Sequence, residues 1–452
     1  MSTPEHENDE VQERLARLAA AGDAEALQEA VAEMHPSDLA DVVESLEDEH
    51  QVMLLSALPA DLASETLAEM EEGDERAELL AALEPAKGAE LLSELPDDDA
   101  ADLVAELEPE ERRRLLEALP LEDAGDIRGL LRYDEETAGG LMTTELVSVK
   151  VTLTAGQALD RVRVLGREVE DFYSVFVVDD RNRLLGTMRL DRLVTADPGS
   201  GVTGLVEPPV ATVLPDMDQE EVGRLIGRYN LASIPVVNEF GVLLGRITFD
   251  DVIDVMEAEH TEDILRLAGV GDPEALRSTW GETVRARLWW LFINLLTAFL
   301  AASVVWIFQG TVDRMVALAV AMPIVAGMGG NAGTQALAVA VRSLALKEDL
   351  GGRAGLILVF REVGVGLVNG VILGVVTALA ALAMHESMKF GLVVMLAMWG
   401  NLVVAGFAGS IVPIVLDRFG IDPAVASSVF VTTFTDMCGF FLLLGLASVI
   451  LL

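Results

Sequence analysis

The stretch VTTFTDMCGFF, residues 431–441, places a carboxylate inside a segment that is otherwise almost uncharged. Within residues 424–452 the only ionisable side chains are those of Asp436 and Cys438. A carboxylate near the middle of a membrane-length segment costs about 2.5–3.5 kcal/mol on insertion scales, and such groups face a bundle interior or a water path. We therefore expect Asp436 to line an ion path, with Thr432 one helical turn before it on the same face.

A second apolar stretch, PIVAGMGGNAGTQALAV at 323–339, is interrupted by glycines and amides. Gly329 and Gly330 precede Asn331, and Gln335 follows it by one helical turn. Small residues alone would indicate a face for helix packing. Two amides on one face favour a polar pathway instead, because loosened backbone is tolerated where it lines water.

Two further polar side chains lie in apolar stretches, Glu362 in LVFREVGVGL and Asn401 beside Gly400. Asn401 is a candidate for the same path, whereas Glu362 has the alternative of pairing with a neighbouring base. Oxygen ligands suit hard cations, and a chain with one cysteine has no Cys/His cluster for zinc or copper. The residues thus predict a cation pathway that favours divalent ions.

These residues belong to five apolar runs, each long enough to cross a hydrocarbon core of about 30 Å. The runs cover approximately 288–308, 315–341, 354–384, 390–416 and 424–452. Arg285 and Arg287 precede the first run, and the link at 342–353 carries three strong bases. By the positive-inside rule, the N-terminal half is expected in the cytoplasm and the C-terminus outside an inner (plasma) membrane.

The charge of the chain divides it in two. The 452 residues have a formal net charge of −43 and are 51% hydrophobic. Residues 284–452 hold nine Lys/Arg and eight Asp/Glu, so residues 1–283 hold 22 and 66. The acidic half lacks a secretory signal and a basic patch, which argues for the cytoplasm and against nucleic acid. A general compositional bias, such as that of halophiles, would also explain much of this acidity.

The acidic half opens with a repeat. Five segments, 35–46, 58–70, 83–95, 95–107 and 119–131, share a proline near the start, acidic residues and then apolar residues at helical spacing. Prolines recur 24 residues apart, from Pro85 to Pro109 and from Pro96 to Pro120. Two short helices per repeat predict a small helical solenoid.

A β-rich unit follows and is duplicated. FYSVFVVDDRNRLLGTMRLDRLV at 172–194 aligns without gaps with LASIPVVNEFGVLLGRITFDDVI at 231–253. Each copy reads as strand, turn, strand and helix. The pair resembles tandem CBS domains, which implies clefts for ATP or another adenine nucleotide. By that resemblance, Thr248 and Asp251 fit the place where a CBS motif meets ribose or phosphate.

The segment after the second copy, 250–270, is strongly acidic, and Arg266 is its one local counter-charge. Its carboxylates include Asp250, Asp251, Asp254, Glu257 and Glu259. Packed against other acidic surfaces they would repel one another unless a hard divalent cation bridged them. The alternative is an ordinary solvated helix face.

The whole chain resembles the MgtE family of magnesium channels and transporters. The matching stretches are EETAGGLMTTE (135–145), DDVIDVMEAEHTEDI (250–264), GMGGNAGTQ (327–335), KEDLGGR…REVGVGL (347–367) and TTFTDMCG (432–439). The resemblance implies a multidomain membrane protein and not an enzyme. Its expected parts are an α-helical superhelical N-domain (1–131), α/β tandem CBS domains (132–200 and 201–260), a connecting plug helix (261–287) and an all-α transmembrane domain of five helices (288–452).

The resemblance also implies a homodimer in the lipid bilayer with the ion path on its two-fold axis. Asp436 would be the central Mg²⁺ site, with Asn331 and the glycine-rich span along the pore. The plug helix is expected at about Ala275–Arg287. Cytoplasmic Mg²⁺ would bridge carboxylates of the N-domain, the CBS pair and the plug, at Asp250, Asp251, Asp254, Glu257 and Glu259, and so close the pore.

Three other functions remain open from the sequence. The same pore could import Co²⁺ or Mn²⁺, although softer ligands are missing from the sequence. The spans could merely anchor a nucleotide-sensing receptor, in which case Asp436 would be dispensable. A scaffold built on the helical repeats would leave the polar residues of the spans unexplained.

Overall fold

The computed structural model describes most of the chain: residues 14–15, 17–18, 24–31, 34–71, 73–167, 169, 172–268, 280–345, 353–419, 421 and 423–452. The chain divides into two compact units, residues 1–256 and 257–452.

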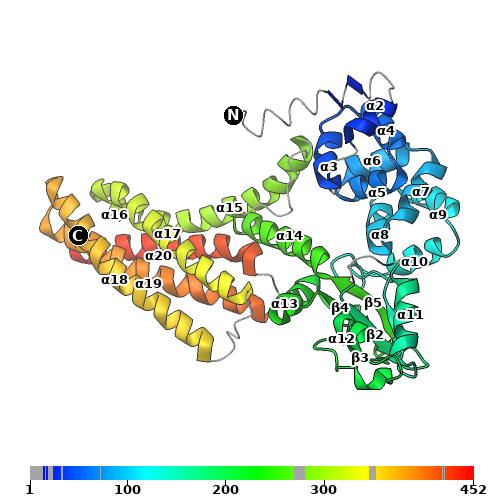
Figure 1. Ribbon diagram of the computed structural model, residues 1–452. Coiled ribbons are helices and arrows are strands. Elements are labelled where there is room, and N and C mark those ends of the chain that lie inside the picture. The colour runs from blue at the N-terminus through cyan, green and yellow to red at the C-terminus, as the bar shows by residue number, and fades with distance from the viewer. Residues whose placement is uncertain are drawn as a thin grey trace, which may run out of the picture. The chain divides into compact units, whose positions relative to one another are not determined.

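Short helices build the N-terminal part of the first unit (Figure 1). They are α2 (Ala24–Val31), α3 (Pro36–Glu44), α4 (Asp48–Ala57), α5 (Ala60–Ala68), α6 (Asp74–Ala82), α7 (Pro85–Glu94), α8 (Asp97–Ala105), α9 (Pro109–Ala118) and α10 (Asp123–Leu130). Proline occupies the first turn of α3, α7 and α9, where its missing N–H costs nothing. The repeated proline is therefore a helix-start signal.

These helices pack mainly on the helix two places along the chain. Contacts join α3 to α5, α5 to α7 and α7 to α9, and a second series joins α2 to α4, α4 to α6, α6 to α8 and α8 to α10. Leucines of successive helices, such as Leu54, Leu67 and Leu80, are almost fully buried between them. The predicted solenoid of helix pairs is confirmed, because each short helix hides its apolar face only by stacking.

The duplicated α/β part follows. Its elements are β1 (Ser148–Lys150), α11 (Ala155–Leu165), β2 (Ser174–Val178), β3 (Leu184–Arg189), α12 (Leu190–Thr195), the 3-10 turn η1 (Val202–Gly204), α13 (Gln219–Tyr229), β4 (Ser233–Val237), β5 (Leu243–Thr248) and α14 (Phe249–Leu267). β2 pairs antiparallel with β3, β4 pairs antiparallel with β5, and β1 adds a parallel strand to β2.

The two copies repeat each other's register. Ser174 lies opposite Arg189 in the first copy, and Ser233 lies opposite Thr248 in the second. Both hairpins also shift register at the same relative position, after Val177 and after Val236. The gapless sequence alignment is thus a structural equivalence, which confirms the tandem α/β domains.

The second unit contains long helices that run side by side (Figure 1). They are α15 (Trp280–Ile307), the short α16 (Gln309–Arg314), α17 (Ala317–Ala345), α18 (Arg353–Ala383), α19 (Met388–Arg418) and α20 (Pro423–Ile450). Among the described residues, five of these helices are long and apolar enough to cross a membrane, as predicted. α19 lies at the centre and contacts α17, α18 and α20, whereas α15 packs on α20.

Glycines allow α18 and α19 to approach closely. Gly366, Gly370 and Gly374 recur every fourth residue on α18 and are buried against α19. A Cβ added at Gly366 would lie 2.3 Å from the carbonyl oxygen of Leu402. Backbone therefore packs on backbone along this interface, as in other membrane helix pairs that use small residues.

Candidate functional site

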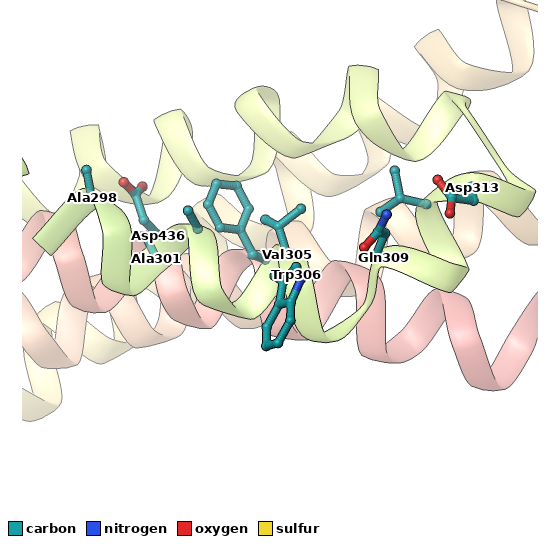
Figure 2. Close-up of a pocket in the computed structure, with 10 residues that line it drawn as sticks. Ala298, Ala301, Val305, Trp306, Gln309, Asp313 and Asp436 are labelled. Atoms are coloured by element: carbon teal, nitrogen blue, oxygen red, sulfur yellow. The ribbon is translucent and has the colours of Figure 1, made fainter.

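A cavity of about 700 Å³, open at the surface of the chain, is lined by α15, α16 and α20 of the second unit, and Asp436 is one of its lining residues. The wall comprises Ala298, Ala301, Ala302, Val305, Trp306, Gln309, Val312, Asp313, Asp436 and Phe440. Figure 2 shows Asp436 near Ala298 and Ala301 at one end, and Gln309 and Asp313 near the other. The cavity is mostly apolar and carries its oxygen ligands at its two ends.

Asp436 projects from a helix of membrane-spanning length and is half-buried. Within the described part of the chain no Lys or Arg pairs with its carboxylate. A carboxylate at this depth is tolerated when water or a cation reaches it. The cavity provides that space, so the arrangement can hold a hydrated cation beside Asp436.

Thr432, one turn before Asp436, uses its hydroxyl within its own helix. Its Oγ1 donates to the carbonyl oxygens of Ser428 (2.8 Å) and Val429 (3.2 Å). Such back-bonding leaves the hydroxyl oxygen able to accept a hydrogen bond but turns its proton inward. Thr432 is half-buried and does not line the cavity.

Asn401 lies in the packed interior of the bundle. Its side chain is fully buried, and Nδ2 donates a 2.9 Å hydrogen bond to the carbonyl oxygen of Val325 on α17. Cβ atoms built on Gly329 and Gly439 would lie 2.1 and 2.7 Å from Nδ2. Asn401 thus joins α17, α19 and α20, and the structure does not bring it to the cavity that holds Asp436.

The other predicted path residues are separated from Asp436 within one chain. Gly329 is buried against Asn401, whereas Asn331 is exposed on α17. Glu362 is 8% exposed, on the α18 helix that packs against α19. Gly330 has no atom within 4 Å of a built Cβ. Of the predicted path residues, the cavity therefore contains Asp436 alone.

A second group of carboxylates lies in the first unit, where α8 meets the start of α14. Asp251 accepts hydrogen bonds from the Oγ1 and the backbone N–H of Thr248, the latter at 3.1 Å. Thr144 donates to Asp97 at the N-terminal end of α8. Thr248 and Asp251, the two residues expected to contact a nucleotide, are hydrogen-bonded to each other.

Burial and mutual repulsion shift the pKa values of this group. Burial, reinforced by Asp251 and Asp99, raises the pKa of Asp98 well above its usual range. Burial and Asp251 likewise raise the pKa of Asp99 to about 6. Burial is also the main reason that the pKa of Asp251 is raised. These carboxylates resist being charged together.

Two buried cations act on these acids, Arg246 on Asp98 and Asp251 and Arg76 on Asp99. Arg246 is 6% exposed, and its Nε donates a 2.9 Å hydrogen bond to the carbonyl oxygen of Glu145. Burial lowers its pKa, against the attraction of Asp98 and Asp251. The side-chain Oδ1 of Asp98 is buried and has no hydrogen-bond partner among the described residues.

The chain resembles known proteins along nearly its whole length. The MgtE family of divalent cation transporters matches residues 322–446, the MgtE intracellular N domain matches 34–136, and CBS domains match 138–199 and 202–258. The magnesium transporter MgtE of Thermus thermophilus is 36% identical over 439 residues, covering 95% of this chain and 96% of that protein. The chain belongs to the MgtE family.

Other relatives and solved structures support the same family assignment. The magnesium transporter MgtE of Bacillus subtilis is 30% identical over 416 residues, or 92% of each chain. The soluble part of a magnesium transporter superposes with a TM-score of 0.51 at 30% identity, covering 56% of this chain and 99% of that one. The cytosolic domain of the Mg²⁺ channel MgtE in complex with ATP gives 0.51 at 38% identity, covering 53% and 98%.

Sequence reasoning about this MgtE-family chain missed four residues of the two sites. Gln309 and Asp313 line the cavity, and their signal is the polar break QGTVDR between two apolar runs. Asp98 and Asp99 belong to the acidic group of the first unit, and their signal is the run DDD at 97–99, which has more carboxylates than one helix start requires.

The structure does not bring together the carboxylates that are predicted to bind Mg²⁺ and close the gate. Asp250 contributes to the repulsion around Asp99 and Asp251, whereas Asp254 and Glu257 are exposed further along α14, with Glu259 half-buried. Among the described residues no three Asp, Glu, His or Cys side chains converge as a metal-ligand set. Of the expected plug helix, residues 275–279 lie outside the described residues, and 280–287 form the first turns of α15.

Proposed function

We propose that this chain is a Mg²⁺ channel that imports Mg²⁺ into the cytoplasm and closes when cytoplasmic Mg²⁺ is high. The observation that carries the proposal is Asp436, a half-buried carboxylate that lines an open cavity beside α15 in a unit with five candidate spans. Relatives at 36% identity over most of the chain are named magnesium transporters. Mg²⁺ keeps several of its waters in proteins, so one carboxylate with room for a hydration shell suits it.

The proposed channel is a homodimer with Asp436 of both copies along the path. Asn331 and Gln335 are exposed on α17, a helix of membrane-spanning length, and amides are unfavourable against lipid. A second copy placed on this face would cover them, and a pore shared by the two copies would contain two Asp436 carboxylates. Paired carboxylates concentrate divalent over monovalent cations. Thr432, Gly329, Gly330, Asn401 and Glu362 would then support the path or its walls.

Import is the proposed direction, with the first unit in the cytoplasm and the C-terminus outside. The bases around the first span and in the 342–353 link support this orientation. A divalent ion moving inward gains about 4.6 kcal/mol at 100 mV, twice the value for one charge. The membrane potential then supplies the driving force without an ATP-hydrolysing site.

We place the gate sensor in the acidic group of α8 and α14. Burial, together with mutual repulsion, raises the pKa values of Asp98, Asp99 and Asp251, and a bridging Mg²⁺ would offset both effects. The remaining carboxylates proposed to hold such ions are Asp250, Asp254, Glu257 and Glu259. Since the present arrangement lacks a preformed ligand set among the described residues, each ion would retain water or draw ligands closer.

We also propose that the CBS pair binds ATP or another adenine nucleotide, with Thr248 and Asp251 near the ribose or phosphate. The 38% identical cytosolic domain of the Mg²⁺ channel MgtE in complex with ATP supports this assignment. Nucleotide binding would then compete for Asp251 with its hydrogen bond from Thr248. Titration of the full chain with ATP, compared with Thr248→Val, tests this assignment.

The test of the channel is Mg²⁺ uptake by proteoliposomes containing wild type, Asp436→Asn, or Asp417→Asn, a carboxylate at the end of α19 that does not line the cavity. Uptake lost only in Asp436→Asn supports the pore. Uptake that falls as Mg²⁺ rises on the soluble side, and falls less in Asp99→Asn than in the exposed control Asp61→Asn, supports the sensor. Uptake unaffected by Asp436→Asn would refute the pore and favour a nucleotide-sensing receptor. Faster uptake of Co²⁺ or Mn²⁺ than of Mg²⁺ would identify one of those ions as the transported substrate.

A further inference from the structure

We infer that Gln309 and Asp313 form an outer site that takes a hydrated divalent cation from water and passes it along the α15–α20 cavity to Asp436. The inference rests on the proposed channel function and on its orientation, in which the link between α15 and α17 faces outward. It deepens that function by assigning a second cation station. The supporting observations are the two polar ends of one cavity, the apolar wall between them and the unpaired state of Asp313.

The two carboxylates are too far apart to share one ion. Figure 2 shows Asp436 near Ala298 and Asp313 near Gln309, at opposite ends of the lining. Along α15, the lining runs from Ala298 to Trp306, a rise of about 12 Å at the usual helical pitch. Direct ligands of Ca²⁺ or Mg²⁺ lie within about 2.6 Å of the ion. The cavity therefore offers two separate stations.

The wall between the stations leaves room for a hydration shell. Ala298, Ala301 and Ala302 form one side, so that a helical face of three methyl side chains borders the cavity. Phe440 follows Asp436 by one helical turn on α20 and lines the same space. Low-dielectric walls focus the field of charges at the ends of a cleft and raise the local concentration of counter-ions. An ion that keeps its water can pass such a wall without direct ligands.

Asp313 is free to attract a cation. Its side chain is exposed, and no ion pair of Asp313 occurs among the residues that the structure describes. Arg314 follows it in α16 but does not line the cavity. The Gln309 amide adds an uncharged oxygen at the same end. One carboxylate and one amide oxygen suit a cation that keeps most of its bound water, as Mg²⁺ usually does in proteins.

The experiment measures initial Mg²⁺ uptake against external Mg²⁺ in proteoliposomes at low ionic strength. It compares wild type with Asp313→Asn, Asp313→Glu and Glu386→Gln. Glu386 is the matched control, a carboxylate in the link between α18 and α19, on the same proposed side, that does not line the cavity. We expect Asp313→Asn to raise the half-saturating Mg²⁺ concentration about tenfold with the maximal rate kept, an effect of the size that charge focusing produces.

Two further readouts separate ion capture from a structural role. The difference between Asp313→Asn and wild type should shrink in about 0.5 M monovalent salt, because screening removes a focused field. Block by external hexaamminecobalt(III), an inert mimic of hydrated Mg²⁺, should weaken in Asp313→Asn and return in Asp313→Glu. Glu386→Gln should match wild type in each assay.

Failure of this inference is distinguishable from failure of the channel. Uptake that requires Asp436 but has the same half-saturation in Asp313→Asn and Glu386→Gln overturns the outer site and leaves the channel. A lower maximal rate with unchanged half-saturation assigns Asp313 a structural role and also overturns it. Absence of uptake by wild type overturns the proposed function and the outer site with it.

Discussion

The side-chain Nδ2 of Asn401 donates a hydrogen bond to the carbonyl oxygen of Val325, 2.9 Å away on a different helix. Asn401 is completely buried, so this bond fixes α19 against α17 in an apolar interior. Its Oδ1 finds no partner among the described residues, so the amide is only half satisfied. We expect Asn401→Leu to lower the stability of the membrane unit by about 0.6–1.7 kcal/mol, the range for one hydrogen bond between membrane helices.

Detergent-induced unfolding of the full chain checks this value. Ser303→Ala is the control, since it removes an exposed hydroxyl of α15 whose hydrogen bond stays within its own helix. Equal losses in the two variants would show that Asn401 is not the residue that fixes α19 to α17.

Two adjacent glycines should respond differently to the same added methyl group. A Cβ on Gly329 would lie 2.1 Å from Nδ2 of Asn401, whereas a Cβ on Gly330 meets nothing within 4 Å. Gly329→Ala should therefore destabilise the bundle by about 1–3 kcal/mol, the usual cost of overpacking. Gly330→Ala should be neutral or slightly stabilising, because alanine favours helix. The same unfolding assay measures both variants. If Gly329→Ala leaves the stability unchanged, the proposed close packing of Gly329 against Asn401 is wrong.

Protonation should stabilise folded α8 when divalent ions are absent. Burial and the charge of Asp251 raise the pKa of Asp99 from 3.8 to about 6, so the folded segment binds more protons than the unfolded segment between those values. Folded α8 is accordingly least stable above pH 6 and gains stability as pH falls toward 4. Hydrogen exchange of α8 in EDTA, corrected for intrinsic rates, should show protection rising about tenfold or more from pH 7.5 to 5.

Mg²⁺ or neutralisation of Asp99 should remove much of that pH dependence. Millimolar Mg²⁺ is expected to protect α8 at pH 7.5, because a bound cation, like a proton, offsets the buried negative charge and its repulsion by neighbouring carboxylates. Asp99→Asn should show high protection at both pH values, and Asp61→Asn should behave as wild type. Protection that rises with pH in wild type would refute the electrostatic account.

A left-handed turn recurs in the two CBS copies, at Asn182 with φ of 61° and at Gly241 with φ of 74°. The turns contact each other, because the N–H of Leu184 donates to Gly241 and that of Leu243 donates to Asn182. Gly241→Ala should cost about 1–2 kcal/mol, since alanine resists this conformation. Gly241→Asn should cost less, as Asn182 indicates.

Calorimetry of the full chain measures both substitutions. Gly201→Ala serves as the control, because Gly201 has a φ of −72° and no atom within 4 Å of a built Cβ. A loss in Gly201→Ala as large as that in Gly241→Ala would exclude backbone strain as the cause.

The sequence determined the parts of this protein that depend on local pattern. Proline spacing predicted the stacked helix pairs, a gapless internal alignment predicted two hairpins of equal register, and apolar length predicted the spans. Asp436 could also be singled out without a structure, because an isolated charge within a long apolar segment is usually functional.

The tertiary structure alone decided which polar residues share a site. Asn401 and Asp436 look alike in sequence, yet one is enclosed beside Gly329 and the other lines a cavity with Asp313. Asp98 and Asp251 are about 150 residues apart, and only the packing of α8 near α14 lets their charges interact. The reason is physical. Which face a helix turns toward its neighbour, and which distant helix it packs on, depend on the close fit of side chains, for example where a glycine without a Cβ lets another helix approach. The periodicity of a single segment does not contain this information.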